Sequence, residues 1–132
     1  MREIKFRGKT VNENEWIYGE TISHGITKRE AHKWFMEVPE YKWKELQDGS
    51  LGQFTGFCDK NGEEIYEGDI VQYTDTVTLK TNRFHVVFDL GCFGLRNDNV
   101  TKQITPISSH IMAKWEVVGN MYDNPDMLKQ DY

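Results

Sequence analysis

Five acidic residues that lie close together in the sequence are the first candidates for chemistry: Asp59, Glu63, Glu64, Glu67 and Asp69. Paired carboxylates bind hard cations and act as general acids and bases in hydrolases. A calcium-binding loop needs oxygen ligands at positions 1, 3 and 5 and a glycine at position 6, whereas here Gly62 follows Asn61 directly. The spacing favours solvated hairpin charges over a metal site. A small hydrolase or nuclease remains the weaker alternative, using Asp59, Glu63, Glu67 and Asp69.

The histidines, serines and glycines do not form a known catalytic or cofactor motif. Histidines at positions 24, 32, 85 and 110 show no HxH, HxxxH or HxE pairing that would direct two groups at one metal or one proton. Ser23–His24 are sequence neighbours, but adjacent strand residues face opposite sides. The glycines between positions 49 and 56 match neither a dinucleotide fingerprint nor a phosphate-binding loop. We therefore expect no catalytic residues, no metal and no cofactor.

Residues 28–44 alternate cations with aromatic side chains, a pattern that can stack on nucleic-acid bases. Glutamates are interspersed among them, so the local net charge is small. We predict an interaction surface here, and its candidate residues are Lys33, Trp34, Phe35, Lys42, Trp43 and Lys44. Lys5, Arg7 and Lys9 add a basic strand face to the nucleic-acid interpretation.

Composition favours a protein partner for this surface over a nucleic acid. The 132 residues carry a formal net charge of −5, which gives no overall attraction to a polyanion. The chain has 4 Trp, 6 Tyr and 7 Phe, more than a small core obviously requires. Aromatic residues are enriched at protein interfaces, so we expect some of these rings to line a contact between subunits or with a partner.

The sequence also predicts where the protein works. No apolar run approaches the roughly 20 residues that span a bilayer, and residues 1–7 alternate charged with apolar side chains instead of leading into a signal peptide. Cys58 and Cys92 match neither a zinc-ligand nor a redox spacing, as expected for two reduced thiols. We expect a cytoplasmic protein with no membrane partner.

The elements that must position these residues are mostly strands. Ile4 and Phe6 alternate with basic residues as in a half-buried strand, and residues 16–19 are rich in aromatic and β-branched side chains. The segment 27–46 allows two interpretations. Thr27 with Glu30 fits the capping box of a short helix, but residues 34–38 also fit a strand ended by Pro39, which we slightly favour.

Beyond residue 53 the turn chemistry is clearer. Residues 54–58 and 63–66 predict a β-hairpin around Asn61–Gly62, with both turn residues at positive φ. Further strands follow at 70–73, 84–88, 92–96 and 115–119, and Asn124–Pro125 begins a short C-terminal helix. The sequence thus predicts one mostly β domain over residues 1–132 with minor α content. Its C-terminal two thirds form a bent antiparallel sheet or a small SH3-like barrel.

Four segments in order along the chain carry a resemblance to a known family. They are Met1–Arg7, Trp16–Gly19, Gly52–Val71 and Glu116–Leu128. Together they resemble the YopX family of phage and prophage proteins, and the block GQFTGFCDKNGEEIYEGDIV is the most specific part. Residues 26–50 and Cys58 depart from the family pattern.

This resemblance implies a β-rich protein encoded by a bacteriophage or prophage and working in the bacterial cytoplasm. It brings no established activity and no catalytic residues. We therefore expect a non-catalytic accessory protein that self-assembles or binds another phage or host protein. The alternative is an accessory nucleic-acid-binding factor for phage DNA or RNA transactions. No small-molecule substrate is expected.

Overall fold

The computed structural model describes residues 2–25 and 27–129 of the chain. The chain divides into two compact units, Met1–Phe54 and Thr55–Tyr132, and each is described separately. Nothing in this division tests the expectation of one domain over residues 1–132, which stays a prediction.

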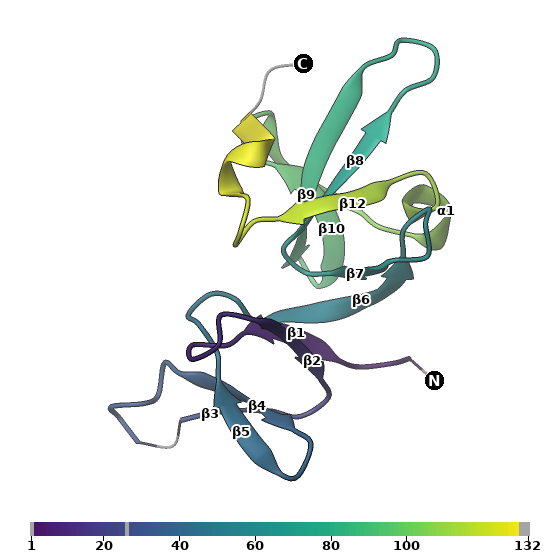
Figure 1. Ribbon diagram of the computed structural model, residues 1–132. Helices are drawn as coiled ribbons and strands as arrows, with labels where there is room; N and C mark the ends of the chain where they lie inside the picture. The colour runs from purple at the N-terminus through teal and green to yellow at the C-terminus, as the bar shows by residue number, and fades with distance from the viewer. Residues whose placement is uncertain (1, 26, 130–132) are drawn as a thin grey trace. The chain divides into compact units, whose positions relative to one another are not determined.

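The first unit contains two small antiparallel sheets (Figure 1). Its strands are β1 (Phe6–Lys9), β2 (Trp16–Gly19), β3 (Ile22–His24), β4 (Trp34–Val38), β5 (Lys42–Glu45) and the start of β6 (Gly52–Cys58). One sheet has the order β2-β1-β6 within this unit, and the other has the order β3-β4-β5. Backbone bonds join the end of β1 to the end of β5, because Val11 N–H donates to the Glu45 carbonyl at 3.0 Å and Gln47 N–H donates to the Lys9 carbonyl at 2.6 Å.

The core of the first unit depends on glycines that let two large side chains come close to the β1–β2 hairpin. Met36 in β4 is 0% exposed and Leu46 just after β5 is 3% exposed. A Cβ atom at Gly8 would lie 2.5 Å from Leu46 Cδ1, and one at Gly19 would lie 3.1 Å from Met36 Sδ. The side of the β3-β4-β5 sheet that carries Met36 is therefore the packed side.

The second unit is built on an antiparallel sheet with the strand order β11-β10-β9-β8-β12. Its elements are β7 (Glu64–Tyr66), β8 (Asp69–Thr74), β9 (Thr81–Asp89), β10 (Cys92–Asn97), β11 (Thr101–Pro106), α1 (Ser109–Met112), β12 (Glu116–Asn120) and the 3-10 helix η1 (Pro125–Lys129). A core cluster brings together buried side chains from the strands and from α1: Ile65, Val71, Val86, Leu95 and Met112.

Asp59 fixes the turn between β6 and β7 in the second unit. Its Oδ1 accepts hydrogen bonds from the backbone N–H groups of Asn61 (2.8 Å) and Glu63 (2.9 Å). Its Oδ2 accepts one from the N–H of Val117 in β12, at 2.9 Å. The carboxylate is buried at 6% exposure and joins the hairpin to a strand 58 residues away.

The mostly β fold that the sequence predicts is confirmed, as are the hairpin and the strand at 34–38. Residues 27–33 form turns, not a helix, with Glu30 N–H donating to Thr27 O at 3.0 Å. In the predicted hairpin only Gly62 has a positive φ, so the expectation for Asn61 was wrong because the Asp59 carboxylate organises that turn. The C-terminal helix is of the 3-10 type, and β3, β5, β11 and α1 were not expected.

The second unit is an open sheet with β11 and β12 at its edges, so the described residues do not form a closed barrel. Of the two architectures that the sequence allowed, the antiparallel sheet is the one observed. In the described part of the chain, no helix has the length and apolarity needed to cross a membrane.

We predict that Asp59→Asn lowers the free energy of unfolding by roughly 1–3 kcal/mol. An amide has one acceptor oxygen where the carboxylate has two, so a buried backbone N–H loses its partner. Urea denaturation measures the change, and Glu63→Gln is the matched control because the Glu63 side chain is exposed. Equal stabilities for the two variants would contradict the role of Asp59.

His85 generates a second prediction, about pH. Burial lowers the pKa of His85, while Asp98 raises it and Arg96 lowers it by smaller amounts. The side chain is 8% exposed, and its Nδ1 has no hydrogen-bond partner among the described residues. The unfolded chain, in which the imidazole has the ordinary pKa of 6.5, therefore binds more protons as the pH falls below that value.

The stabilising contribution of neutral His85 is complete above pH 6.5 and is lost as the pH falls through the lower pKa of the folded state. We expect a smaller free energy of unfolding at pH 5.5 than at pH 7.5, and a weaker pH dependence in His85→Gln. Urea titrations at the two pH values test this, with His110→Gln as the control for an exposed histidine. An unchanged pH dependence in His85→Gln would refute it.

Candidate functional site

The six residues of the predicted interaction surface come together on two neighbouring strands. Trp34 and Phe35 lie in β4, Lys33 directly precedes β4, and the other three lie in β5. The strands pair antiparallel, with Glu37 opposite Trp43 and Phe35 opposite Glu45. Segments seven or more residues apart in sequence are thus brought together in the β3-β4-β5 sheet.

This sheet has two different sides, and the six residues divide between them. Residues directly opposite each other in a ladder share a side, and neighbours along a strand alternate. Trp34, Lys42 and Lys44 therefore share the packed side with Met36. We call the other side the open face, and its residues are Ser23, Lys33, Phe35, Glu37, Trp43 and Glu45.

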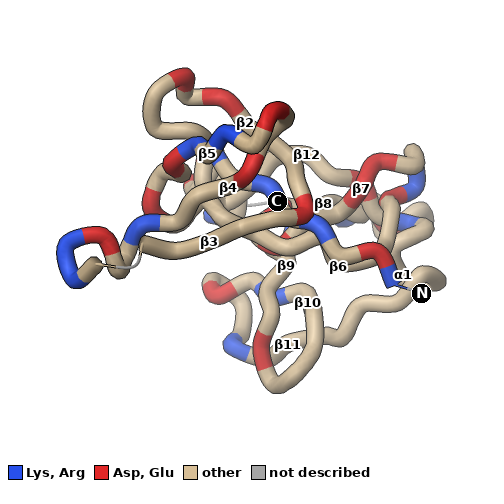
Figure 2. The backbone as a smooth tube through the Cα atoms, turned by 90° about the horizontal axis from the view of Figure 1, so that it is seen from below, with Lys and Arg blue, Asp and Glu red and all other residues tan. Residues whose placement is uncertain are grey.

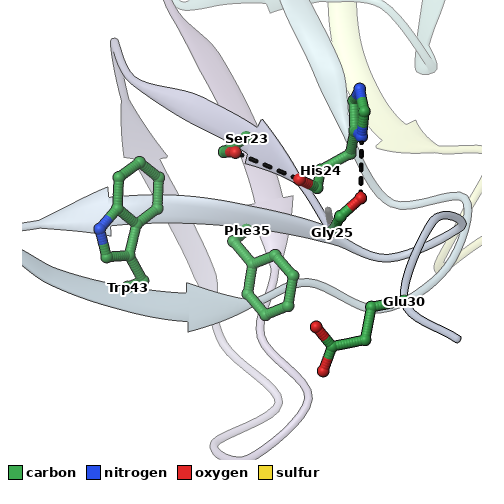
Figure 3. A pocket seen from close by; sticks show the side chains of 6 residues that line it. All are labelled: Ser23, His24, Gly25, Glu30, Phe35 and Trp43. Atoms are coloured by element: carbon green, nitrogen blue, oxygen red, sulfur yellow. Dashed lines mark hydrogen bonds between the residues drawn. The ribbon is translucent and has the colours of Figure 1, made fainter. Parts of the chain in front are cut away.

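The open face carries a cavity of about 260 Å³. Figure 3 shows the rings of Phe35 and Trp43 side by side, with the Glu30 carboxylate entering from the loop before β4. Ser23 donates its hydroxyl hydrogen bond to the His24 carbonyl at 3.2 Å, and His24 Nδ1 lies 3.2 Å from the Gly25 carbonyl. The cavity is thus walled by two aromatic rings, with a carboxylate and backbone carbonyls at its rim.

The aromatic rings on this sheet are accessible on both sides, although to different degrees. Trp43 is 46% exposed on the open face. Trp34 is 38% exposed on the other side, where its ring makes an edge-on contact with His24 at 5.2 Å between centroids. The ring that combines large exposure with a neighbouring cavity is therefore Trp43.

All three lysines of the predicted surface are paired with carboxylates. Lys33 lies 3.8 Å from Glu45, Lys42 lies 3.5 Å from Glu40, and Lys44 lies 2.5 Å from Glu13. The first unit contains nine Lys or Arg and nine Asp or Glu, so its formal charge is zero. These residues therefore do not create the concentrated positive potential that attracts phosphates.

The basic residues of β1 pack against aromatic rings of the same unit. Arg7 is 8% exposed and its guanidinium lies 4.9 Å from the centre of the Trp16 ring. Lys9 lies over the same ring at 5.9 Å, and Lys5 lies 4.9 Å from the Phe54 ring. These cations therefore contribute to packing within the unit.

Two of the five clustered carboxylates, Asp59 and Asp69, are found in structural roles. Asp59 holds its turn as described above, and Asp69 Oδ2 accepts a bond from Tyr66 N–H at 2.7 Å. The Ser108 hydroxyl caps α1 by accepting from Ile111 N–H at 3.3 Å. Over residues 2–25 and 27–129, no three His, Cys, Asp or Glu side chains gather in a way that could hold a metal ion.

A second cavity of about 580 Å³ lies in the same unit, where β4 turns into β5. Its lining includes the exposed rings of Tyr18 and Tyr41. Glu40 and Tyr41 form the turn with φ angles of 69° and 58°, a left-handed conformation that non-glycine residues adopt at a cost. Its lining is more acidic than that of the Phe35–Trp43 cavity, with Glu20, Glu37 and Glu40.

Sequence reasoning identified Phe35 and Trp43 but missed the rest of the cavity. Ser23 and Gly25 belong to β3 and the residue after it, a strand that the sequence did not reveal. Glu30 was predicted only as the partner of Thr27 in a capping box and as one of the interspersed glutamates. The sequence did contain a signal for the two sides of the sheet, because side chains alternate along the predicted strand 34–38 and this places Trp34 and Phe35 on opposite sides.

Comparison with known proteins gives consistent results. The model of the family described as YopX protein matches residues 5–129. The chain is similar to the crystal structure of protein EF1440 from Enterococcus faecalis, with 22% identity, a TM-score of 0.58, and 97% of this chain and 99% of that chain covered. It is also similar to protein yopX from Bacillus subtilis, with 20% identity, a TM-score of 0.57 and full coverage of both chains. At these identities the likeness shows the fold. No curated protein matches the chain.

Substitutions on the two sides of the sheet should change stability by different amounts. Trp43→Ser should change the free energy of unfolding by less than about 1 kcal/mol, because the ring is half exposed on the open face. Met36→Ala should cost about 2–5 kcal/mol, because that side chain is completely buried. Urea denaturation of the two variants measures both, and a larger loss in Trp43→Ser would show that the sides are assigned wrongly.

Proposed function

The chain belongs to the YopX protein family, and from that premise we propose that it is a non-catalytic accessory protein of a phage or prophage that binds protein through its open face. The bound protein is a second copy of the chain or another phage or host protein. It acts in the cytoplasm of the bacterial host, which fits the two free thiols of Cys58 and Cys92.

The observation that carries this proposal is that the aromatic rings of Phe35 and Trp43 line the same cavity on the open face. Large aromatic rings contribute most of the binding energy at many protein interfaces, particularly where a neighbouring pocket receives a partner side chain. Trp43 exposes 46% of its surface, and nothing in the packing of Met36 on the other side of the sheet requires that ring. Exposure of a tryptophan at such a place is better explained by association than by folding.

The charges of the sheet support a protein partner over a nucleic acid. The cations nearest the rings are neutralised by Glu45, Glu40 and Glu13. The cavity rim adds the Glu30 carboxylate and backbone carbonyls, which repel phosphates and accept hydrogen bonds from peptide or side-chain donors. A polypeptide segment with an apolar anchor and N–H donors fits this chemistry.

The non-catalytic part of the proposal is supported by the uses of the candidate catalytic groups. Both oxygens of Asp59 accept backbone hydrogen bonds, and the Ser108 hydroxyl caps a helix. General acid–base catalysis needs a group that can reach and protonate a substrate. Asp59, Asp69 and Ser108 are instead engaged in turns and a helix cap.

We predict that Trp43→Ser abolishes a protein interaction that Trp34→Ser retains. The two substitutions are matched, because they remove the same ring from opposite sides of one sheet. The measurement is affinity capture from lysate of phage-infected cells, together with sedimentation equilibrium of the purified variants. Unchanged association in Trp43→Ser, both with itself and with captured proteins, would refute the proposal.

The nucleic-acid alternative has its own measurement. Fluorescence anisotropy with single-stranded and duplex oligonucleotides at low salt should show no binding, since the lysines are already paired. Binding that weakens steeply as the salt concentration rises, and that is lost in a Lys33→Ala, Lys42→Ala, Lys44→Ala variant, would replace the protein-binding proposal with the nucleic-acid one.

A further inference from the structure

The outer edge of β3 presents unpaired backbone groups. The bonds between β3 and β4 involve alternate residues, as shown by Glu37 N–H donating to Thr21 O at 3.0 Å and Gly25 N–H donating to Lys33 O at 3.0 Å. Ile22 and His24 lie between those positions, so their backbone groups point away from β4. In the described part of the chain, the N–H groups of both residues and the Ile22 carbonyl have no hydrogen-bond partner.

Although β3 is short, this edge lacks the side chains that often keep edge strands from pairing. Natural proteins protect such edges with lysine, proline, bulges or a covering loop. The sequence of β3 is Ile-Ser-His, and Figure 2 shows it without a charged residue. Ser23 and His24 are exposed and Ile22 is half-buried. The strand is therefore open to a further strand.

The opposite edge of the same sheet is protected. At β5, the Glu45 carbonyl already accepts the Val11 N–H at 3.0 Å. Two copies of β5 pairing antiparallel about Lys42, Trp43 or Lys44 would each place a lysine directly opposite a lysine. Like charges directly opposite each other destabilise a ladder. Addition of an identical strand is therefore disfavoured at β5.

We propose that two copies of the chain associate by antiparallel pairing of their β3 strands, with Ile22 opposite the partner's Ile22. This inference goes beyond the proposed function, because the contact is made by the β3 edge and leaves the open face of each copy free. The two Ile22 residues exchange both backbone bonds across a two-fold axis. Ser23 lies opposite the partner's Thr21, and His24 lies opposite the partner's Glu20, so the register contains an apolar pair, hydroxyl pairs and no like-charge pair.

The paired sheet runs β5-β4-β3-β3-β4-β5. Opposite residues in a ladder point to the same side, so the two open faces form one continuous surface. The edges that remain exposed are the two β5 strands, which carry lysines. Association therefore stops at the dimer.

The first test removes one outward N–H group. Ile22→Pro deletes a donor that β4 does not use, and proline is tolerated at such positions of an edge strand. Ile22→Val keeps the donor and the β-branched shape. In sedimentation equilibrium of the full chain, Ile22→Pro should raise the dimer dissociation constant by at least about tenfold, while Ile22→Val should leave it nearly unchanged. Circular dichroism confirms that both variants fold.

The second test fixes the register through charge. Glu20→Lys and His24→Glu should each weaken the dimer, because each puts like charges or an unmatched charge across the two-fold axis. The double variant restores opposite charges at both positions and should recover dimerisation. No other register of β3 places residues 20 and 24 opposite each other, so failure of the double variant to recover would overturn the proposed pairing.

Failure of this inference can be told apart from failure of the proposed function. A strictly monomeric chain at millimolar concentration, or a dimer unaffected by Ile22→Pro, overturns the β3 pairing. Trp43-dependent capture of a different protein would leave the proposed function standing in either case. A dimer lost in both Ile22→Pro and the single charge variants, and recovered in the double variant, supports the pairing.

Discussion

The burial of Met36 and Leu46 against two glycines is the constraint on which the first unit depends. Because Gly8 and Gly19 have no Cβ, the β3-β4-β5 sheet comes close to the β1–β2 hairpin, and the side that carries Met36 becomes the interior. Because side chains alternate along a strand, Phe35, Glu37 and Trp43 must then point to the opposite side of the sheet from Met36. The position of the open face therefore follows from packing on the opposite side. The packing of this unit does not explain why the open face carries aromatic rings.

A comparable constraint holds the second unit. The Asp59 carboxylate accepts hydrogen bonds from three backbone N–H groups in two separate segments. A side chain with the chemistry of a catalytic acid therefore connects the two segments. Buried hydrogen bonds to a charged acceptor are stronger than those between neutral groups. An acidic residue in a conspicuous cluster is thus explained by the geometry of one turn and one distant strand.

The sequence predicted the local elements well and the long-range ones poorly. The hairpin around Gly62 and the strand ended by Pro39 depend on neighbouring residues, whose turn chemistry and β propensity are visible in the chain. The hydrogen bond from Val117 N–H to Asp59 joins residues 58 positions apart, and no local sequence pattern predicts it. The strand β3 has three residues, too few for a clear alternation, so the part of the cavity that it supplies was missed. The predicted surface was treated as one patch because its residues are close in sequence, whereas the sheet separates them by side.

The cavity beside Trp43 has a further consequence if the sheet is doubled through β3. A dimer would then present two identical sites on the same surface, at a separation fixed by the strands between them. Once one site is occupied, binding at the other becomes intramolecular, so a target that repeats its recognition element gains avidity that neither site provides alone. Such a protein would distinguish assembled, repetitive targets from their single subunits, even though both offer the same local contacts.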